Sequence, residues 1–140
     1  MSIYVLKLSN AKGKKDKLSS TDILSIHLGY YMINGKVTYS TGIPIAEKPK
    51  YVILTLGNDL GNCYLCHVKE YAYQGKEIYF TPSEDIFEKY SPDKYKKIDN
   101  VTWLVFDSMQ KIEVDFLDQI RPNEKISTLI KSKMGNCKKI

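Results

Sequence analysis

The segment with the most specific chemistry is Cys63–His67, which matches the C-x-x-C-H pentapeptide that attaches haem covalently. In that use two thiols add to the haem vinyl groups and the histidine ligates iron. The segment lies within a run that predicts a β-strand, and the chain has two histidines, so we do not expect haem. A structural zinc site needs four ligands, typically on two turns. Cys137 and His27 are the remaining candidates, and nothing local joins them. We therefore predict buried core cysteines, no metal and no cofactor.

Catalytic motifs are also missing from the sequence. Nucleophilic catalysis needs a base beside the nucleophile, but strand alternation places Cys66 and His67 on opposite faces. The chain contains no G-x-S-x-G, H-E-x-x-H or G-x-x-x-x-G-K-[ST] pattern. Glu113, Asp115 and Asp118 fall on a predicted helix, where they form a solvated acidic face. These observations predict a protein that is not an enzyme.

The charge is concentrated near the two ends of the sequence. The net charge is +5, and residues 121–140 hold six basic side chains and one acidic one. A second basic cluster comprises Lys12, Lys14, Lys15 and Lys17. Such clusters attract phosphate backbones or acidic protein surfaces, although lysine-rich ends can also be solvated tails. Arg121 is the single arginine, so phosphate contact is favoured over base-specific recognition.

Aromatic residues are the other excess, with 11 tyrosines, four phenylalanines and one tryptophan. A tyrosine combines a flat apolar face with a hydroxyl group, which is useful for stacking on bases or for protein recognition. We predict that Tyr30, Tyr31 and Trp103 stack on bases or line a pocket. The alternative is that the tyrosines are ordinary strand residues and that Trp103 belongs to the core.

The first third of the chain predicts a strand, a helix and a hairpin. Ile3–Leu8 is rich in β-branched and aromatic residues, as expected for a strand. Thr21-Asp22 predicts the N-cap of an amphipathic helix, which Gly29 weakens or ends early. Asn34-Gly35 is a strong hairpin signal, with Lys36–Thr41 as the return strand.

The remainder predicts strands joined by short turns, followed by helices. Tyr51–Leu56 is nearly continuously apolar, as in a strand covered on both faces, and Cys63–Tyr71 returns beside it. Further strands are expected at 77–80 and 101–106, with short helices around Ile86, Val114–Ile120 and Ile126–Ile130. We assign Val52, Leu54, Leu65 and Trp103 to one core. Residues 1–140 are predicted to be a single α+β domain with a basic C-terminal segment, 121–140. Its sheet is a curved antiparallel β-sheet or small β-barrel with peripheral helices.

Two stretches of this chain, Lys50–Gly57 and Gly61–Val68, resemble the central strand pair of PUA-like domains, particularly the EVE type. Phe80–Pro82 and Thr102–Leu104 are similar to the segments before the closing strand of that family. The resemblance covers roughly residues 3–120. It implies a small bent β-barrel whose pocket holds an extruded or modified base, or an RNA segment. The tryptophan and asparagine landmarks of the first half of EVE domains are missing here. The resemblance therefore implies the fold of that family and not its modified-base pocket.

Two functions follow from these patterns. The first is a non-catalytic domain that binds DNA or RNA through a tyrosine-lined β surface and lysine-rich ends. The second is an inhibitor or adaptor, such as a phage-encoded protein acting on a bacterial nucleic-acid-targeting defence complex. An acidic patch supports the second function and comprises Glu84, Asp85, Glu88 and Asp93. Met1–Leu8 lacks the pattern of a signal peptide, and no apolar run is long enough for a membrane span, so we expect a cytoplasmic protein.

Overall fold

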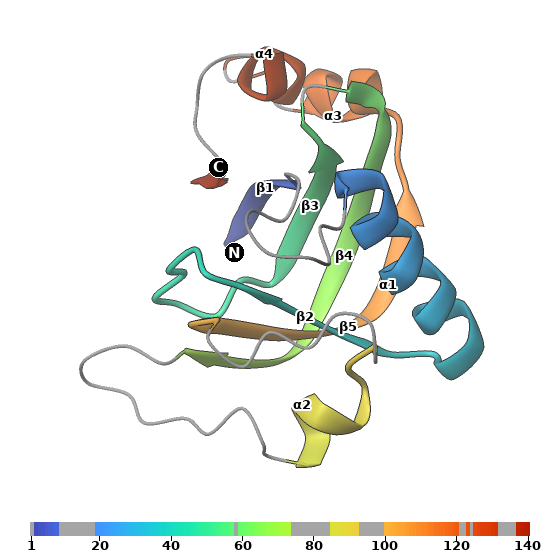
Figure 1. The fold of residues 1–140 in the computed structure, drawn as a ribbon. Helices are drawn as coiled ribbons and strands as arrows, with labels where there is room; N and C mark the ends of the chain where they lie inside the picture. The colour runs from blue at the N-terminus through green and yellow to red at the C-terminus, as the bar shows by residue number, and fades with distance from the viewer. Residues whose placement is uncertain are drawn as a thin grey trace.

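A six-stranded sheet organises the chain, in the order β2-β5-β4-β3-β1-β6 (Figure 1). This is a computed structural model that describes residues 2–8, 19–57, 59–73, 85–92, 100–120, 123, 125–131 and 137–140. The strands in these ranges are β1 (Ile3–Leu8), β2 (Val37–Thr41), β3 (Tyr51–Leu56), β4 (Asp59–Tyr73), β5 (Thr102–Lys111) and β6 (Cys137–Lys139). The helices are α1 (Ser20–Asn34), α2 (Asp85–Lys89), α3 (Val114–Ile120) and α4 (Ile126–Lys131).

The α+β class is confirmed, but the sheet is neither wholly antiparallel nor closed. β1 pairs in parallel with β3, whereas the other neighbouring strands run antiparallel. β2 and β6 form the two edges, so the sheet is open. A parallel pair needs a long crossover, and here the connection from β1 to β3 contains α1 and β2. Hairpin signals in the sequence do not reveal that pairing.

Helix α1 begins earlier and runs further than its sequence predicts. Ser19 is the N-cap: its hydroxyl accepts a hydrogen bond from the Asp22 amide at 3.1 Å, and the Asp22 carboxylate accepts one from the Ser19 amide. The helix continues through Gly29. It ends at Gly35, which has a φ of 76° and donates to the Tyr31 carbonyl at 2.7 Å. Asn34-Gly35 is therefore a helix C-cap and not a hairpin turn, since both motifs use a glycine at positive φ.

The remaining elements mostly match the predictions. β1, β2, β3 and the three short helices lie where expected, while β4 and β5 are longer. The predicted strand at 77–80 lies outside the described residues. β6 was not predicted, because Cys137–Lys139 is short and lysine-rich; it pairs with β1. No helix in the described ranges is long and apolar enough to cross a membrane.

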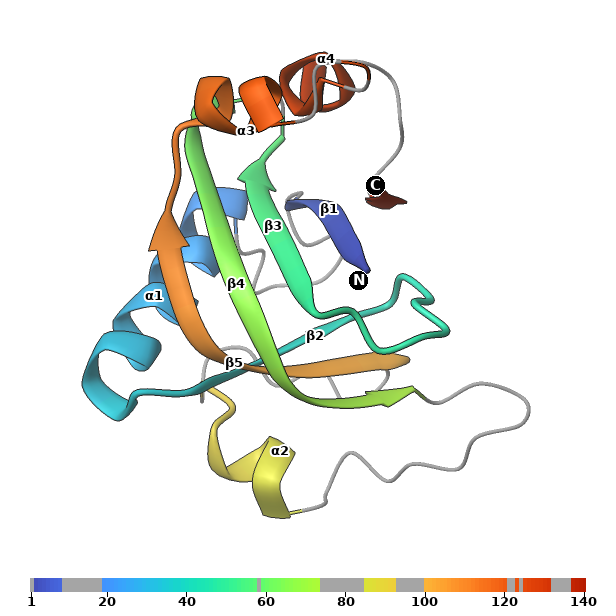
Figure 2. The same cartoon turned by 180° about the vertical axis from the view of Figure 1, so that it is seen from behind.

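The core is divided into three clusters, and the prediction of one core is wrong. α1 covers one face of the sheet, where Val52 and Leu54 are buried, and α3 and α4 lie over the end of the other face (Figures 1 and 2). Leu65 borders the cluster beneath α3 and α4. Trp103 packs with Phe87 of α2 in a third cluster. Alternation along the strands sends neighbouring apolar residues to opposite faces, so proximity in sequence does not place them together.

Leu54 provides a test of the packing beneath α1. Its side chain is 1% exposed in the centre of β3, so Leu54→Ala should lower the free energy of unfolding by about 2–5 kcal/mol. Urea unfolding measures the loss. Ile33→Ala is the matched control, because Ile33 is 85% exposed and its truncation should change stability by no more than about 0.5 kcal/mol. Equal losses in the two variants would contradict the placement of β3.

His27 provides a second test, through pH. Its ring is 1% exposed, and burial lowers its pKa to about 4, although a hydrogen bond to the Ile23 carbonyl acts in the opposite direction. Between about pH 6.5 and pH 4 the unfolded chain therefore binds a proton that the folded protein does not. The free energy of unfolding should therefore decrease as the pH is lowered through this window, by about 2 kcal/mol from pH 7 to pH 5. Urea unfolding of wild type and His27→Gln at both pH values isolates the contribution. An unchanged pH dependence in the variant would refute it.

Candidate functional site

A β-bulge in β5 turns a carboxylate toward a histidine on the neighbouring strand. His67 lies opposite Ser108, but the next residue, Val68, lies opposite Phe106, so Asp107 is an extra residue on β5. A bulge bends the strand and can redirect a side chain. Here the bulge places Asp107 beside His67, on the face of the sheet that α1 does not cover.

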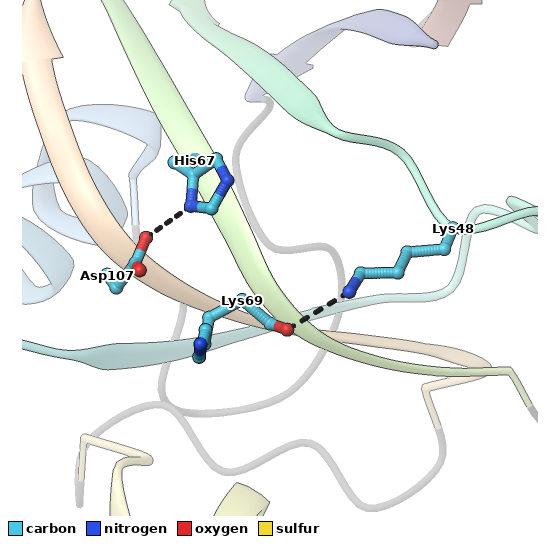
Figure 3. Close-up of polar contacts among 4 residues, drawn as sticks. All are labelled: Lys48, His67, Lys69 and Asp107. Atoms are coloured by element: carbon cyan, nitrogen blue, oxygen red, sulfur yellow. Dashed lines mark hydrogen bonds and ion pairs between the residues drawn. The ribbon is translucent and has the colours of Figure 1, made fainter. Parts of the chain in front are cut away.

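A second bulge follows immediately on β4. Val68 lies opposite Phe106 and Glu70 opposite Val105, so Lys69 is the extra residue. β4 and β5 both bend sharply along their length (Figure 2). The Lys69 carbonyl accepts a hydrogen bond from the Lys48 ammonium at 3.1 Å (Figure 3). A cationic side chain thus satisfies a backbone carbonyl at the bulge.

His67 is held from two sides. Its Nδ1 lies 2.6 Å from Oδ1 of Asp107, and the Tyr51 ring meets the imidazole edge-on with 5.3 Å between centroids. A carboxylate only accepts hydrogen bonds, so Nδ1 carries a hydrogen, and in the neutral form of the ring the lone pair is on Nε2. Nε2 is on the side of the ring away from Asp107 (Figure 3). The His67 and Asp107 side chains are 34% and 31% exposed, so a ligand can reach the pair.

Two open hollows meet at His67. The first, which we call the polar hollow, has a volume of about 380 Å³ and is lined by Tyr51, Leu65, His67, Asp107, Ser108 and Gln110. The second, which we call the basic hollow, has a volume of about 320 Å³ and is lined by Lys48, Pro49, Lys50, His67, Val68 and Lys69. The first is therefore lined by residues with an aromatic ring, an amide and a hydroxyl, while three lysines line the second.

The segment that carries Lys48 and Lys50 is fixed by its backbone. The Lys48 carbonyl accepts from the Ser2 hydroxyl, and the Lys50 amide donates to the Ser2 carbonyl. The Lys50 carbonyl in turn accepts from the Val68 amide at 3.0 Å, at the level of the bulges. The two lysines consequently keep a defined position relative to His67.

Glu47, which precedes Lys48 in the sequence, is already paired. Its carboxylate lies 2.6 Å from the Lys139 ammonium and accepts from the Tyr4 hydroxyl at 2.8 Å. The bonds from Lys139 and Tyr4 lower the pKa of Glu47. Burial, followed by the Glu47 contact, raises the pKa of Tyr4 to about 12. Asp107 lines the polar hollow, and three lysines line the basic hollow.

The cysteines of the C-x-x-C-H segment lie in the core, as predicted. Cys63 and Cys66 are fully buried on opposite faces of β4, and burial raises the pKa of the Cys66 thiol. Within the described ranges, no group of three or more histidine, cysteine, aspartate or glutamate side chains is arranged to hold a metal ion.

The structure does not bring the predicted binding residues together. Tyr30 donates its hydroxyl to the Lys89 carbonyl at 2.8 Å, and Tyr31 is half-buried beside it on α1, across the sheet from His67. Trp103 is 3% exposed and donates its indole N–H to the Asn100 carbonyl. Its ring has no free face for a base, which agrees with the core alternative. The predicted lysines Lys12, Lys14, Lys15 and Lys17 lie outside the described residues.

Sequence patterns do not predict the His67–Asp107 pair. They indicate His67 only as a ligand or as a partner for its neighbour Cys66, and Asp107 is one acid among several. The available signal was an acid directly after the apolar run Trp103–Phe106, near the predicted end of a core strand. Of the acidic patch proposed for an inhibitor, the Glu88 side chain alone lies in the described part of the chain, and it is exposed on α2.

Comparison with known proteins gives no match. No protein-family model matches the chain, and neither a curated protein nor a solved structure matches it. The resemblance to PUA-like domains therefore stays a prediction, and the function rests on the site itself.

Proposed function

We propose that this protein binds nucleic acid through the basic hollow, where Lys48, Lys50 and Lys69 contact phosphates. The observation that carries this proposal is the convergence of three lysines on one open surface beside His67. Lysine is a compact point charge that neutralises phosphate and releases its counterions. The cytoplasmic location predicted from the sequence gives access to such a ligand.

The polar hollow supports a nucleotide ligand over a simple anion. It adjoins the basic hollow at His67 and presents the Tyr51 ring, the Ser108 hydroxyl and the Gln110 amide. Aromatic rings stack with bases, while hydroxyl and amide groups bond to sugars and base edges. A chain of nucleotides running across both hollows places its charged backbone on one and its uncharged parts on the other.

The lysine-rich ends extend the same proposal. Long-range attraction brings the nucleic acid toward four lysines near the N-terminus, which add phosphate contacts: Lys12, Lys14, Lys15 and Lys17. Tyr30 and Tyr31 lie across the sheet from the basic hollow and are left out of the interface. The protein thus binds mainly through charge and has little preference for sequence.

Salt dependence tests the basic hollow. In the double variant Lys50→Gln/Lys69→Gln, two phosphate contacts are lost, whereas Lys48 is kept because it also bonds to the Lys69 carbonyl. The slope of log affinity against log salt should become shallower by about 1.4 on single strands and about 1.8 on duplex. Fluorescence anisotropy with labelled oligonucleotides of several sequences measures the change, which should be similar for all of them.

The matched control is Lys89→Gln/Lys111→Gln, which removes the same charge from exposed positions on α2 and at the end of β5, outside the basic hollow and the lysine-rich ends. Its slope should stay close to that of wild type. Changing Lys12, Lys14, Lys15 and Lys17 to Ala in a separate variant measures the N-terminal contribution. If wild type retains neither DNA nor RNA at about 50 mM salt, where phosphate contacts are strong, the proposal is wrong and the inhibitor or adaptor function leads.

A further inference from the structure

Building on the proposed function, and in contrast to the expectation from sequence motifs that the protein is not an enzyme, we infer that His67 acts as a general base in the cleavage of RNA at the junction of the two hollows. The nucleophile is the 2′-hydroxyl of the bound RNA, and the bond broken is the adjacent phosphodiester. Three features carry this inference: the His67–Asp107 pair at 2.6 Å, its accessibility from both hollows, and the lysines beside it.

The pair has the geometry of an oriented proton acceptor. Asp107 fixes the imidazole through Nδ1, and the Tyr51 ring restrains it from a second direction. Nε2 is left with its lone pair on the side away from the carboxylate (Figure 3). An imidazole held in this tautomer by a carboxylate can take a proton from a hydroxyl placed against Nε2. His67 is then the catalytic residue, and Asp107 is a positioning residue.

RNA is the substrate class that this set of groups can cleave. Its 2′-hydroxyl is an internal nucleophile next to the phosphorus atom, so one base suffices to activate it, whereas DNA lacks that group. Negative charge grows on the non-bridging phosphate oxygens as the new bond forms. Lys50 and Lys69, in the basic hollow beside His67, supply the compensating positive charge.

The reaction balances without a co-reactant. His67 Nε2 takes the 2′-hydroxyl proton as the 2′-oxygen bonds to phosphorus, and the bond from phosphorus to the 5′-oxygen breaks. The leaving 5′-oxygen takes a proton from a water molecule in the open hollow, and the imidazolium returns its proton to the resulting hydroxide. The products are a 2′,3′-cyclic phosphate and a 5′-hydroxyl end.

The experiment incubates the purified protein with a labelled single-stranded RNA and with the DNA of the same sequence. Wild type should cleave the RNA to ends that mass spectrometry identifies as 2′,3′-cyclic phosphate, and should leave the DNA intact. His67→Gln should lower the cleavage rate by about 10²–10⁴-fold, the usual contribution of a general base. Its affinity for RNA should stay within about threefold of wild type, because the lysines are unchanged.

Asp107→Asn tests the positioning role. An asparagine amide can donate to Nδ1 and so move the hydrogen to Nε2, where it blocks proton uptake. We expect kcat to fall by about 10²-fold or more with little change in KM, and ¹⁵N NMR of the imidazole to report the exchanged tautomer. Lys111→Gln, an exposed position outside both hollows that is purified in the same way, should cleave at the wild-type rate, so that a loss in the other variants does not come from their preparation.

The outcomes separate this inference from the proposed function. RNA that is bound but not cleaved overturns the inference and leaves the proposed binding intact. Absence of binding overturns both. Cleavage by His67→Gln at the wild-type rate would show that His67 is not the general base. Products without a cyclic phosphate would exclude attack by the 2′-hydroxyl.

Discussion

Two consecutive register shifts between β4 and β5 are the constraint on which the rest of the structure depends. Each adds one residue to one strand, Asp107 on β5 and Lys69 on β4, and bulged strands bend and twist more strongly. The bend lets one sheet pack α1 near its middle and α2 beside its far end, and it separates Trp103 from the other clusters. The same shifts turn Asp107 onto His67. Architecture and candidate chemistry therefore share one cause.

Backbone and side-chain requirements meet at the same place. A bulge leaves a carbonyl outside the regular ladder, and the Lys48 ammonium satisfies the carbonyl of Lys69. That bond draws a positive charge toward the sheet, while the Lys50 amide donates to the Ser2 carbonyl and the Lys50 carbonyl accepts from the Val68 amide. The basic hollow thus forms partly because the bent strands leave a backbone carbonyl that needs a hydrogen-bond donor. A structural lysine and a phosphate-binding lysine are compatible roles, because an ammonium group has three donors.

Features set by neighbouring residues could be predicted from the sequence, whereas features that depend on distant residues could not. Local composition predicts strands at Ile3–Leu8 and Tyr51–Leu56, and both strands are present. The hairpin predicted at Asn34-Gly35 is wrong, because a glycine at positive φ can close a hairpin or end a helix. Which of the two forms depends on the tertiary structure. The His67–Asp107 pair joins residues 40 positions apart through an irregular register. Periodicity within one segment carries no information about such a register, so the fold class was predictable and the candidate site was not.

The position of β1 has a consequence for how the chain reaches this fold. β1 lies between β3 and β6, so the strand at Ile3–Leu8 is completed on one side by the strand at Cys137–Lys139, more than 100 residues later. Contacts between such distant segments form slowly, because a long loop must close first. During synthesis, β1 would therefore expose an apolar edge, with Val5 and Leu6 at its centre, until Cys137–Lys139 emerges from the ribosome. Unpaired edges of this kind recruit other strands, so nascent chains are expected to be prone to aggregation until Cys137–Lys139 has been made.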